Sequence, residues 1–180
     1  ILYTGDHYSI SSIPEMQERT IILDGFSKSY AMTGWRMGYG IFPEELVPHI
    51  VKLAVNSVSC AAPFTQKAAV AALEGPRDEV EAMVAEFGIR RRLIADGLQS
   101  IPGVNCPEPE GAFYAFPSIK ETGLTSIEFE TKAMNEAGVA LLSGSAFGEY
   151  GEGYVRLSYA NSQENIQKAI SQLDKMVRSL

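Results

Sequence analysis

The chain has 180 residues, a hydrophobic share of 46% and a formal net charge of −7 at pH 7. A chain of this length and composition can bury a sizeable core, and its negative charge argues against nucleic acid or an anionic membrane surface as the main partner. The sequence contains no apolar run of about 18 residues, so no membrane span is predicted. Its two cysteines, Cys60 and Cys106, do not form a C-x-x-C motif, which predicts buried free thiols, no metal site and a reducing, cytoplasmic location.

The first part of the chain is predicted to alternate short strands with helices. Residues 20–24 and 37–42 are short apolar runs that we expect to be the last strands of a large, mostly parallel sheet. A helix is predicted over residues 43–58, because proline suits a first helical turn and the two glutamates that follow complement the helix dipole. A second apolar helix is predicted over residues 63–73, where a Gly-Pro pair then ends it.

Residues 77–100 have the pattern of one long amphipathic helix. Val80, Phe87 and Ile94 recur every seven residues, which places apolar side chains along a single stripe. The stretch is short for a coiled coil and has caps, so we interpret the stripe as a face that packs on a core.

After residue 100 the pattern becomes a mixture of strands and helices. Strands are predicted over residues 111–116, 139–142 and 154–159. In the last of them, alternate residues would face opposite sides of the sheet. This alternation places Val155, Leu157 and Tyr159 on one face and Tyr154, Arg156 and Ser158 on the other.

Two helix starts are predicted in the same region. Thr125 and Glu128 have the spacing of a capping box, which predicts a helix from there to about Ala137. Asn161 and Glu164 have a related spacing and predict the start of a terminal helix. The apolar face of that helix is expected to comprise Ile166, Ala169, Ile170, Leu173 and Val177.

The residues most suggestive of chemistry lie between the first two predicted strands, in the sequence G-F-S-K-S-Y-A-M-T-G-W-R-M-G-Y (residues 25–39). Lys28 follows a strand on a tight turn of small residues, a placement that favours chemistry over solvation. Arg36 lies eight residues later, and its guanidinium is a rigid fork suited to a phosphate or a carboxylate. The simpler alternative is a solvated lysine and an arginine in a weak surface ion pair.

Residues 27–39, S-K-S-Y-A-M-T-G-W-R-M-G-Y, closely resemble the lysine motif of class I (fold type I) aminotransferases, which depend on pyridoxal 5'-phosphate (PLP). Four further segments resemble parts of the same family and occur in the family's order. They are Y-T-G-D-H at residues 3–7, G-A-F-Y at 111–114, G-S-A-F-G at 144–148 and Y-V-R-L-S-Y at 154–159. The resemblance therefore covers essentially the whole chain.

The resemblance implies an α/β fold. Residues 1–75 would form the end of the large PLP-binding domain, with its parallel-rich sheet, and residues 76–100 a long interdomain helix. Residues 101–180 would form the small C-terminal α+β domain. The family's D-E-I-Y signature and phosphate loop would lie before residue 1, so we expect a truncated C-terminal half that is inactive in isolation.

The same resemblance implies roles for three residues near the motif. Lys28 would form the Schiff base with PLP and then move the proton of the substrate, which requires desolvation or neighbouring cations to lower the pKa of its amine. Arg36 would bind the cofactor phosphate. Ser27 would supply a phosphate-binding hydroxyl, because Gly25 occupies the position where relatives often have one; Ser29, residues before the chain, or a purely local role for Ser27 remain alternatives.

Arg156 would bind the α-carboxylate of the substrate, and its alternative is a solvated arginine on the polar face of its strand. Phe147 would contact the substrate side chain or anchor its loop, and Trp35 and Tyr39 are predicted to pack in the core. The implied activity is transfer of an amino group from an amino acid to a 2-oxo acid by a homodimer. Two alternatives keep the fold: a PLP-dependent carbon–sulfur lyase or synthase, and a non-catalytic sensor domain.

Overall fold

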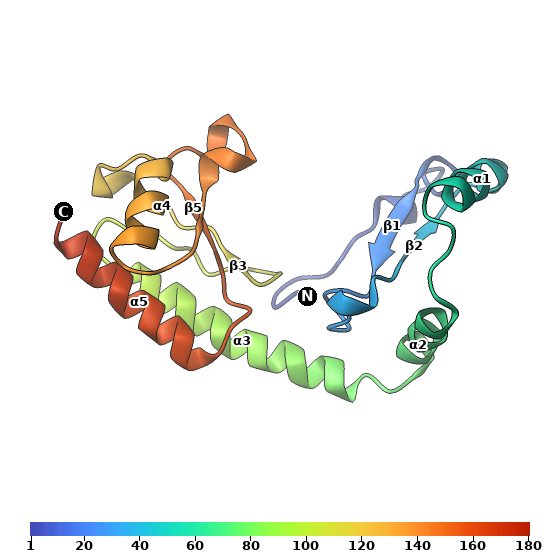
Figure 1. Cartoon of the computed structure of the whole chain (residues 1–180), viewed down its shortest axis with the longest axis horizontal. Coiled ribbons are helices and arrows are strands. Elements are labelled where there is room, and N and C mark those ends of the chain that lie inside the picture. Colours follow the sequence, from blue (N-terminus) through green and yellow to red (C-terminus); the bar gives the residue numbers. More distant parts are fainter. The chain divides into compact units, whose positions relative to one another are not determined.

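The structure, a computed structural model, describes residues 1–180 and consists of two compact units (Figure 1). The first, which we name the lysine unit because it carries Lys28, comprises Asp6–Ala82. The second, the C-terminal unit, comprises Ile1–Gly5 together with Met83–Leu180. The first five residues thus pack with the later part of the chain, whereas the predicted first domain ran from residue 1 to residue 75. The assignment of these parts to a large and a small domain stays a prediction.

The lysine unit contains one pair of strands, β1 (Ile22–Gly25) and β2 (Gly38–Ile41). They are antiparallel, with Leu23 opposite Gly40 and Asp24 opposite Tyr39. The expectation that these strands continue a parallel sheet is therefore wrong for this pair. The physical reason is the connection between them, which contains only a 3-10 turn, because a parallel crossover needs a longer segment that is usually an α-helix.

Two helices complete the lysine unit, α1 (Val47–Ser57) and α2 (Pro63–Glu74). Each has a proline in its first turn, where the missing N–H costs no intrahelical hydrogen bond. The helix predicted over residues 43–58 begins as a 3-10 turn, Glu44–Leu46, before α1. The unit has a small core, formed by Phe26, Met32 and Ala69.

The C-terminal unit combines three helices with a three-stranded sheet. In chain order its elements are α3 (Asp78–Gln99, which the unit contains from Met83 onward), β3 (Tyr114–Ala115), α4 (Ser126–Asn135), β4 (Leu142–Ser143), β5 (Val155–Ser158) and α5 (Gln163–Arg178). The sheet order is β3-β5-β4 and both pairs are antiparallel, so β5 is the central strand. The strand predicted over residues 111–116 is reduced to the two residues of β3.

Helices α3 and α5 lie side by side (Figure 1). Their close approach depends on Gly97, because a Cβ at this position would clash with the side chain of Ile170. The buried face of α3 contributes Ile94 and Leu98 to the core. The apolar face predicted for the terminal helix is confirmed, since three of its members are buried and two are partly buried against the same core.

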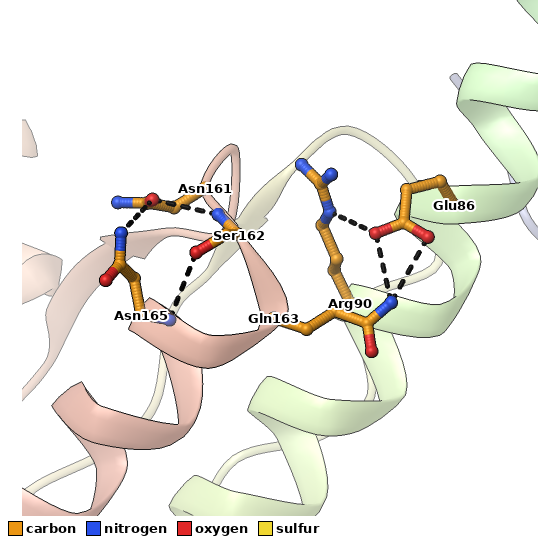
Figure 2. Close-up of polar contacts among 6 residues, drawn as sticks. All are labelled: Glu86, Arg90, Asn161, Ser162, Gln163 and Asn165. Atoms are coloured by element: carbon orange, nitrogen blue, oxygen red, sulfur yellow. Dashed lines mark hydrogen bonds and ion pairs between the residues drawn. The ribbon is translucent and has the colours of Figure 1, made fainter.

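The helix starts are defined by side-chain caps. The predicted capping box of α4 is confirmed: the Thr125 hydroxyl accepts from the Glu128 N–H, and the Glu128 carboxylate accepts from the Thr125 N–H at 2.9 Å. The cap of α5 is Ser162, whose hydroxyl accepts from the Asn165 N–H at 3.2 Å (Figure 2). The start predicted at Asn161 is therefore one residue too early, because the Asn161 side chain accepts from the Ser162 N–H instead.

The first residues of the chain form a short extension of the C-terminal unit. Leu2 pairs with Gly111 as an antiparallel bridge, and the Tyr3 N–H donates to the Glu110 carbonyl at 2.9 Å. The Tyr3 hydroxyl donates to the Ala112 carbonyl at 2.7 Å and lies 3.4 Å from the hydroxyl of Tyr159. Burial raises the pKa of both tyrosines, so both hydroxyls remain protonated at neutral pH. None of the helices combines the length and apolar composition that crossing a bilayer requires.

Candidate functional site

The turn that carries Lys28 is fixed at both ends by the main chain. It leaves β1 at Phe26, whose N–H donates to the Met37 carbonyl at 3.2 Å, beside the start of β2. The Met32 N–H returns to the Phe26 carbonyl at 3.2 Å, and the Ala31 N–H closes the turn on the Lys28 carbonyl at 3.1 Å. These bonds give the backbone around Lys28 a defined path.

Apolar packing anchors the same turn to α2. Phe26 and Met32 are buried against Ala69 of α2. The rings of Tyr30 and Tyr39 lie 5.4 and 5.6 Å from the ring of Phe26. The turn therefore has a buried base, formed by Phe26 and Met32, from which the residues between them project.

Lys28 is exposed, and its amine forms no ion pair or hydrogen bond within the chain. Of the two conditions that could lower the pKa of this amine, desolvation and neighbouring cations, the exposed position of Lys28 does not provide the first. Ser27 is half-buried, and its hydroxyl forms no hydrogen bond, so the local backbone role considered for it is not observed. The Lys28 amine and the Ser27 hydroxyl therefore have no hydrogen-bond partner within the chain.

Arg36 follows the turn in a left-handed conformation, with φ of 52°. Its side chain is exposed, and its Nη1 donates to the Thr33 carbonyl at 2.9 Å. The residue lines a hollow of about 840 Å³ with Trp35, between the turn and the segment that leads into α2. The other lining residues are Ala31, Gly34, Val58, Cys60, Ala61, Ala62, Phe64 and Thr65. Lys28 and Ser27 do not line this hollow, so the structure places Lys28 and Arg36 on one loop without bringing them into one cavity.

Trp35 and Tyr39 are exposed, which corrects the prediction that they pack in the core. Their exposure follows from the small size of the core of the lysine unit, which only Phe26, Met32 and Ala69 form. The Tyr39 hydroxyl donates to the Asp24 carboxylate at 3.3 Å. Partial desolvation and the neighbouring Asp24 charge raise the pKa of Tyr39.

Arg156 lies in β5, the central strand of the C-terminal sheet. The predicted alternation is confirmed, since Val155, Leu157 and Tyr159 are buried whereas Arg156 is half-buried and Ser158 exposed. The Arg156 guanidinium carbon lies 4.5 Å from the ring centre of Tyr114 and 4.7 Å from that of Phe147. No carboxylate lies within ion-pair distance of it.

The two rings beside Arg156 belong to a larger aromatic group. Phe147 meets Phe116 edge to face at 6.1 Å, and Phe116 stacks on Tyr154 at 5.5 Å. From its sequence context, Phe147 was expected to contact the substrate or to anchor its loop, and its contact with Arg156 was not predicted. The pairing joins segments that are distant in sequence, and only the alternation of the 154–159 strand pointed to the correct face. No group of three or more His, Cys, Asp or Glu side chains is arranged to hold a metal ion.

Comparison with known proteins identifies the family. Residues 2–173 match the family described as aminotransferase class I and II. This chain belongs to the class I and II aminotransferases. Among relatives in this aminotransferase family, the chain is 45% identical over 174 residues to an aspartate aminotransferase of Pyrococcus abyssi, covering 96% of the chain and 44% of the relative. It is 44% identical over 180 residues to aromatic-amino-acid aminotransferase 2 of Thermococcus litoralis, covering 98% and 46%.

Solved aminotransferase structures share the fold. A crystal structure of an aromatic aminotransferase from Pyrococcus horikoshii matches with a TM-score of 0.95 and 42% identity, covering 99% of this chain and 48% of that one. An aspartate aminotransferase from Rhizobium meliloti matches with a TM-score of 0.93 and 33% identity, covering 99% and 47%. The α/β fold of the aminotransferases is therefore shown for this chain, which spans about half the length of the relatives it matches.

Proposed function

We propose that this chain is part of an enzyme that uses PLP to transfer an amino group from an amino acid to a 2-oxo acid. The observation that carries the proposal is the family match over residues 2–173, which includes the complete motif of residues 27–39. The relatives described above are named for amino-group transfer, which supports this reaction over a carbon–sulfur lyase or a sensor domain.

The side chains of the lysine unit suit PLP by their chemistry. An unpaired Lys28 amine can bond to an aldehyde, and an Arg36 guanidinium without a carboxylate partner has donors to offer a phosphate dianion. The unbonded Ser27 hydroxyl can donate to the same phosphate. When bound, PLP supplies an electron sink that stabilises negative charge at the substrate α-carbon.

The chain's own groups then hold the substrate and move its proton. Arg156 binds the α-carboxylate through paired N–H donors, which selects amino and oxo acids over simple amines. The Lys28 Nζ would accept the proton from the substrate α-carbon and deliver it to the C4′ carbon of the cofactor, acting first as general base and then as general acid. We further propose a cytoplasmic homodimer. Residues 1–75 would belong to the large domain, 76–100 to an interdomain helix and 101–180 to the small domain.

Cofactor attachment tests this proposal directly. The chain is mixed with PLP, reduced with borohydride, digested and mapped by mass spectrometry, with absorbance recorded before reduction. We expect the label on Lys28, and we expect the Lys28→Ala variant to lose both the label and the Schiff-base absorbance band. The matched control is Lys52→Ala, which removes another exposed lysine of the same unit and should keep both.

A label spread evenly over surface lysines, or retained in Lys28→Ala, would contradict the role of Lys28. Arg36→Gln provides a second readout, because loss of a charge-assisted phosphate contact should weaken PLP affinity by about tenfold or more while leaving Lys28 reactive. We expect negligible turnover from the chain alone, since it spans less than half the length of its relatives.

A further inference from the structure

The surroundings of the Arg156 guanidinium differ from those of the other arginines that lie over aromatic rings. Two other arginines of the C-terminal unit lie over aromatic rings: Arg90, 5.4 Å from the ring centre of Phe87, and Arg91, 4.8 Å from that of Tyr3. Both also have carboxylate partners, at 2.7 and 3.1 Å respectively. Arg156 lies over two rings and has no carboxylate, although its side chain is half-buried.

The two rings approach Arg156 from the two strands that flank it. Tyr114 belongs to β3, on one side of β5, and Phe147 belongs to the 3-10 turn that directly follows β4, on the other side. Phe147 is supported in turn by the edge-to-face contact with Phe116. The position of the guanidinium is therefore set by side chains from both neighbouring elements.

Aromatic faces attract a cation without using its hydrogen-bond donors. The attraction arises from the ring quadrupole, so it acts on the charge of the guanidinium and leaves its N–H groups unpaired. A carboxylate partner, such as that of Arg90, would instead occupy those donors and neutralise the charge. Arg156 is thus positioned while its capacity to bind an external carboxylate is kept.

We propose that Tyr114 and Phe147 are positioning residues that orient the Arg156 guanidinium for the carboxylate of the substrate. The inference rests on the proposed function, in which Arg156 binds that carboxylate. The two rings act through the arginine and do not themselves contact the substrate.

The test follows the Arg156 Nε–Hε signal by NMR in the isotopically labelled chain during titration with 2-oxoglutarate. Phe147→Leu and Tyr114→Leu keep an apolar side chain but remove the ring face, so each should weaken binding by about fivefold and reduce the ring-current shift of Arg156. Phe147→Tyr and Tyr114→Phe retain the rings and should bind within about twofold of the parent chain. Tyr150→Leu is the control, because Tyr150 is 91% exposed, follows Phe147 closely and contacts no cation or aromatic ring.

The outcomes distinguish failure of the positioning role of the two rings from failure of the carboxylate-binding role of Arg156. Leucine variants that bind 2-oxoglutarate as tightly as the parent, with the parent signal of Arg156 still shifting, would overturn the positioning role and leave the carboxylate role intact. An Arg156 signal that does not respond in the parent chain, or unchanged affinity in Arg156→Gln, would overturn both. The attachment of PLP to Lys28 is measured separately and is unaffected by either result.

Discussion

The lysine unit and the C-terminal unit differ in how much apolar surface each buries within itself. Nearly all the buried apolar side chains of the chain belong to the C-terminal unit, whereas the lysine unit buries only Phe26, Met32 and Ala69. In the lysine unit, Leu23, Val58 and Phe64 are 75%, 73% and 70% exposed. Since apolar burial is the main source of folding free energy, the C-terminal unit has its own source of stability and the lysine unit has little.

This difference bears on the two candidate binding regions. Arg156 lies on a strand whose alternate residues are buried in a large core, and two rings hold its side chain. Lys28 lies on a turn whose only buried residues are Phe26 and Met32. A precise site requires supporting residues that are themselves held in place, so the arginine is better preorganised than the lysine.

The largest expected difference between the units is in the free energy of unfolding lost when one leucine of each is replaced by alanine. Leu173→Ala in α5 removes a side chain that is 1% exposed, and it should lower the free energy of unfolding by about 3 kcal/mol. Leu53→Ala in α1 removes a side chain that is 65% exposed, and it should change that free energy by less than about 0.5 kcal/mol. Urea unfolding followed by far-ultraviolet circular dichroism measures both. Similar losses in the two variants would refute the contrast between the units.

A smaller effect is expected from the two thiols as the pH rises. Burial raises the pKa of Cys106 from 9.0 to about 11, so the stability that this protonated thiol provides is complete below pH 9 and is lost as the pH rises through 11. The loss should be about 2 kcal/mol in urea unfolding, and Cys106→Ala should reduce it. Cys60 is exposed in the lysine unit, so the prediction that both thiols are buried is wrong for it, and Cys60→Ala should leave the pH dependence of stability unchanged. A parent-like pH dependence in Cys106→Ala would rule out the thiol as its source.

The smallest effect concerns helix caps in the two units. Thr125→Ala removes the capping box of α4 and should cost about 1 kcal/mol, while the pKa of Glu128, lowered by its bonds to Thr125, should rise toward its ordinary value. Ser9→Ala removes the cap of a three-residue 3-10 turn in the lysine unit and should cost less than about 0.5 kcal/mol. Urea unfolding gives the stabilities, and NMR titration gives the pKa of Glu128. If the pKa of Glu128 were the same in Thr125→Ala as in the parent chain, the capping box would not operate in solution.

Local signals in the sequence predicted most of the helices and the faces they bury. The Thr125 capping box, the proline at the start of α2 and the apolar stripe of α5 depend on neighbours within a turn or two, and each agrees with the structure. Pro43, predicted to open the first helix, instead precedes a 3-10 turn. The error at Asn161 was a single residue, because Asn and Ser are both good caps and only the bond that Ser162 accepts from the Asn165 main-chain N–H distinguishes them.

Features that depend on distant segments were not predictable. Predicting the antiparallel pairing of β1 with β2 would have required knowing that their connection forms no crossover helix. The contacts of Arg156 with Tyr114 and Phe147 depend on the order β3-β5-β4, which no local pattern encodes. The site residues themselves came from resemblance to a family, since spacing alone did not distinguish Lys28 from a solvated lysine.

The pairing of Ile1–Gly5 with the C-terminal unit has a consequence for the order of events on the ribosome. The hydroxyls of Tyr3 and Tyr159 meet across a separation of 156 positions, so their contact closes a loop that includes most of the chain. Closing such a loop has an entropic cost, and it cannot happen until β5 has been synthesised. The contact between these two hydroxyls therefore forms only after Tyr159 has been made, and the whole lysine unit is synthesised in the interval between the two tyrosines.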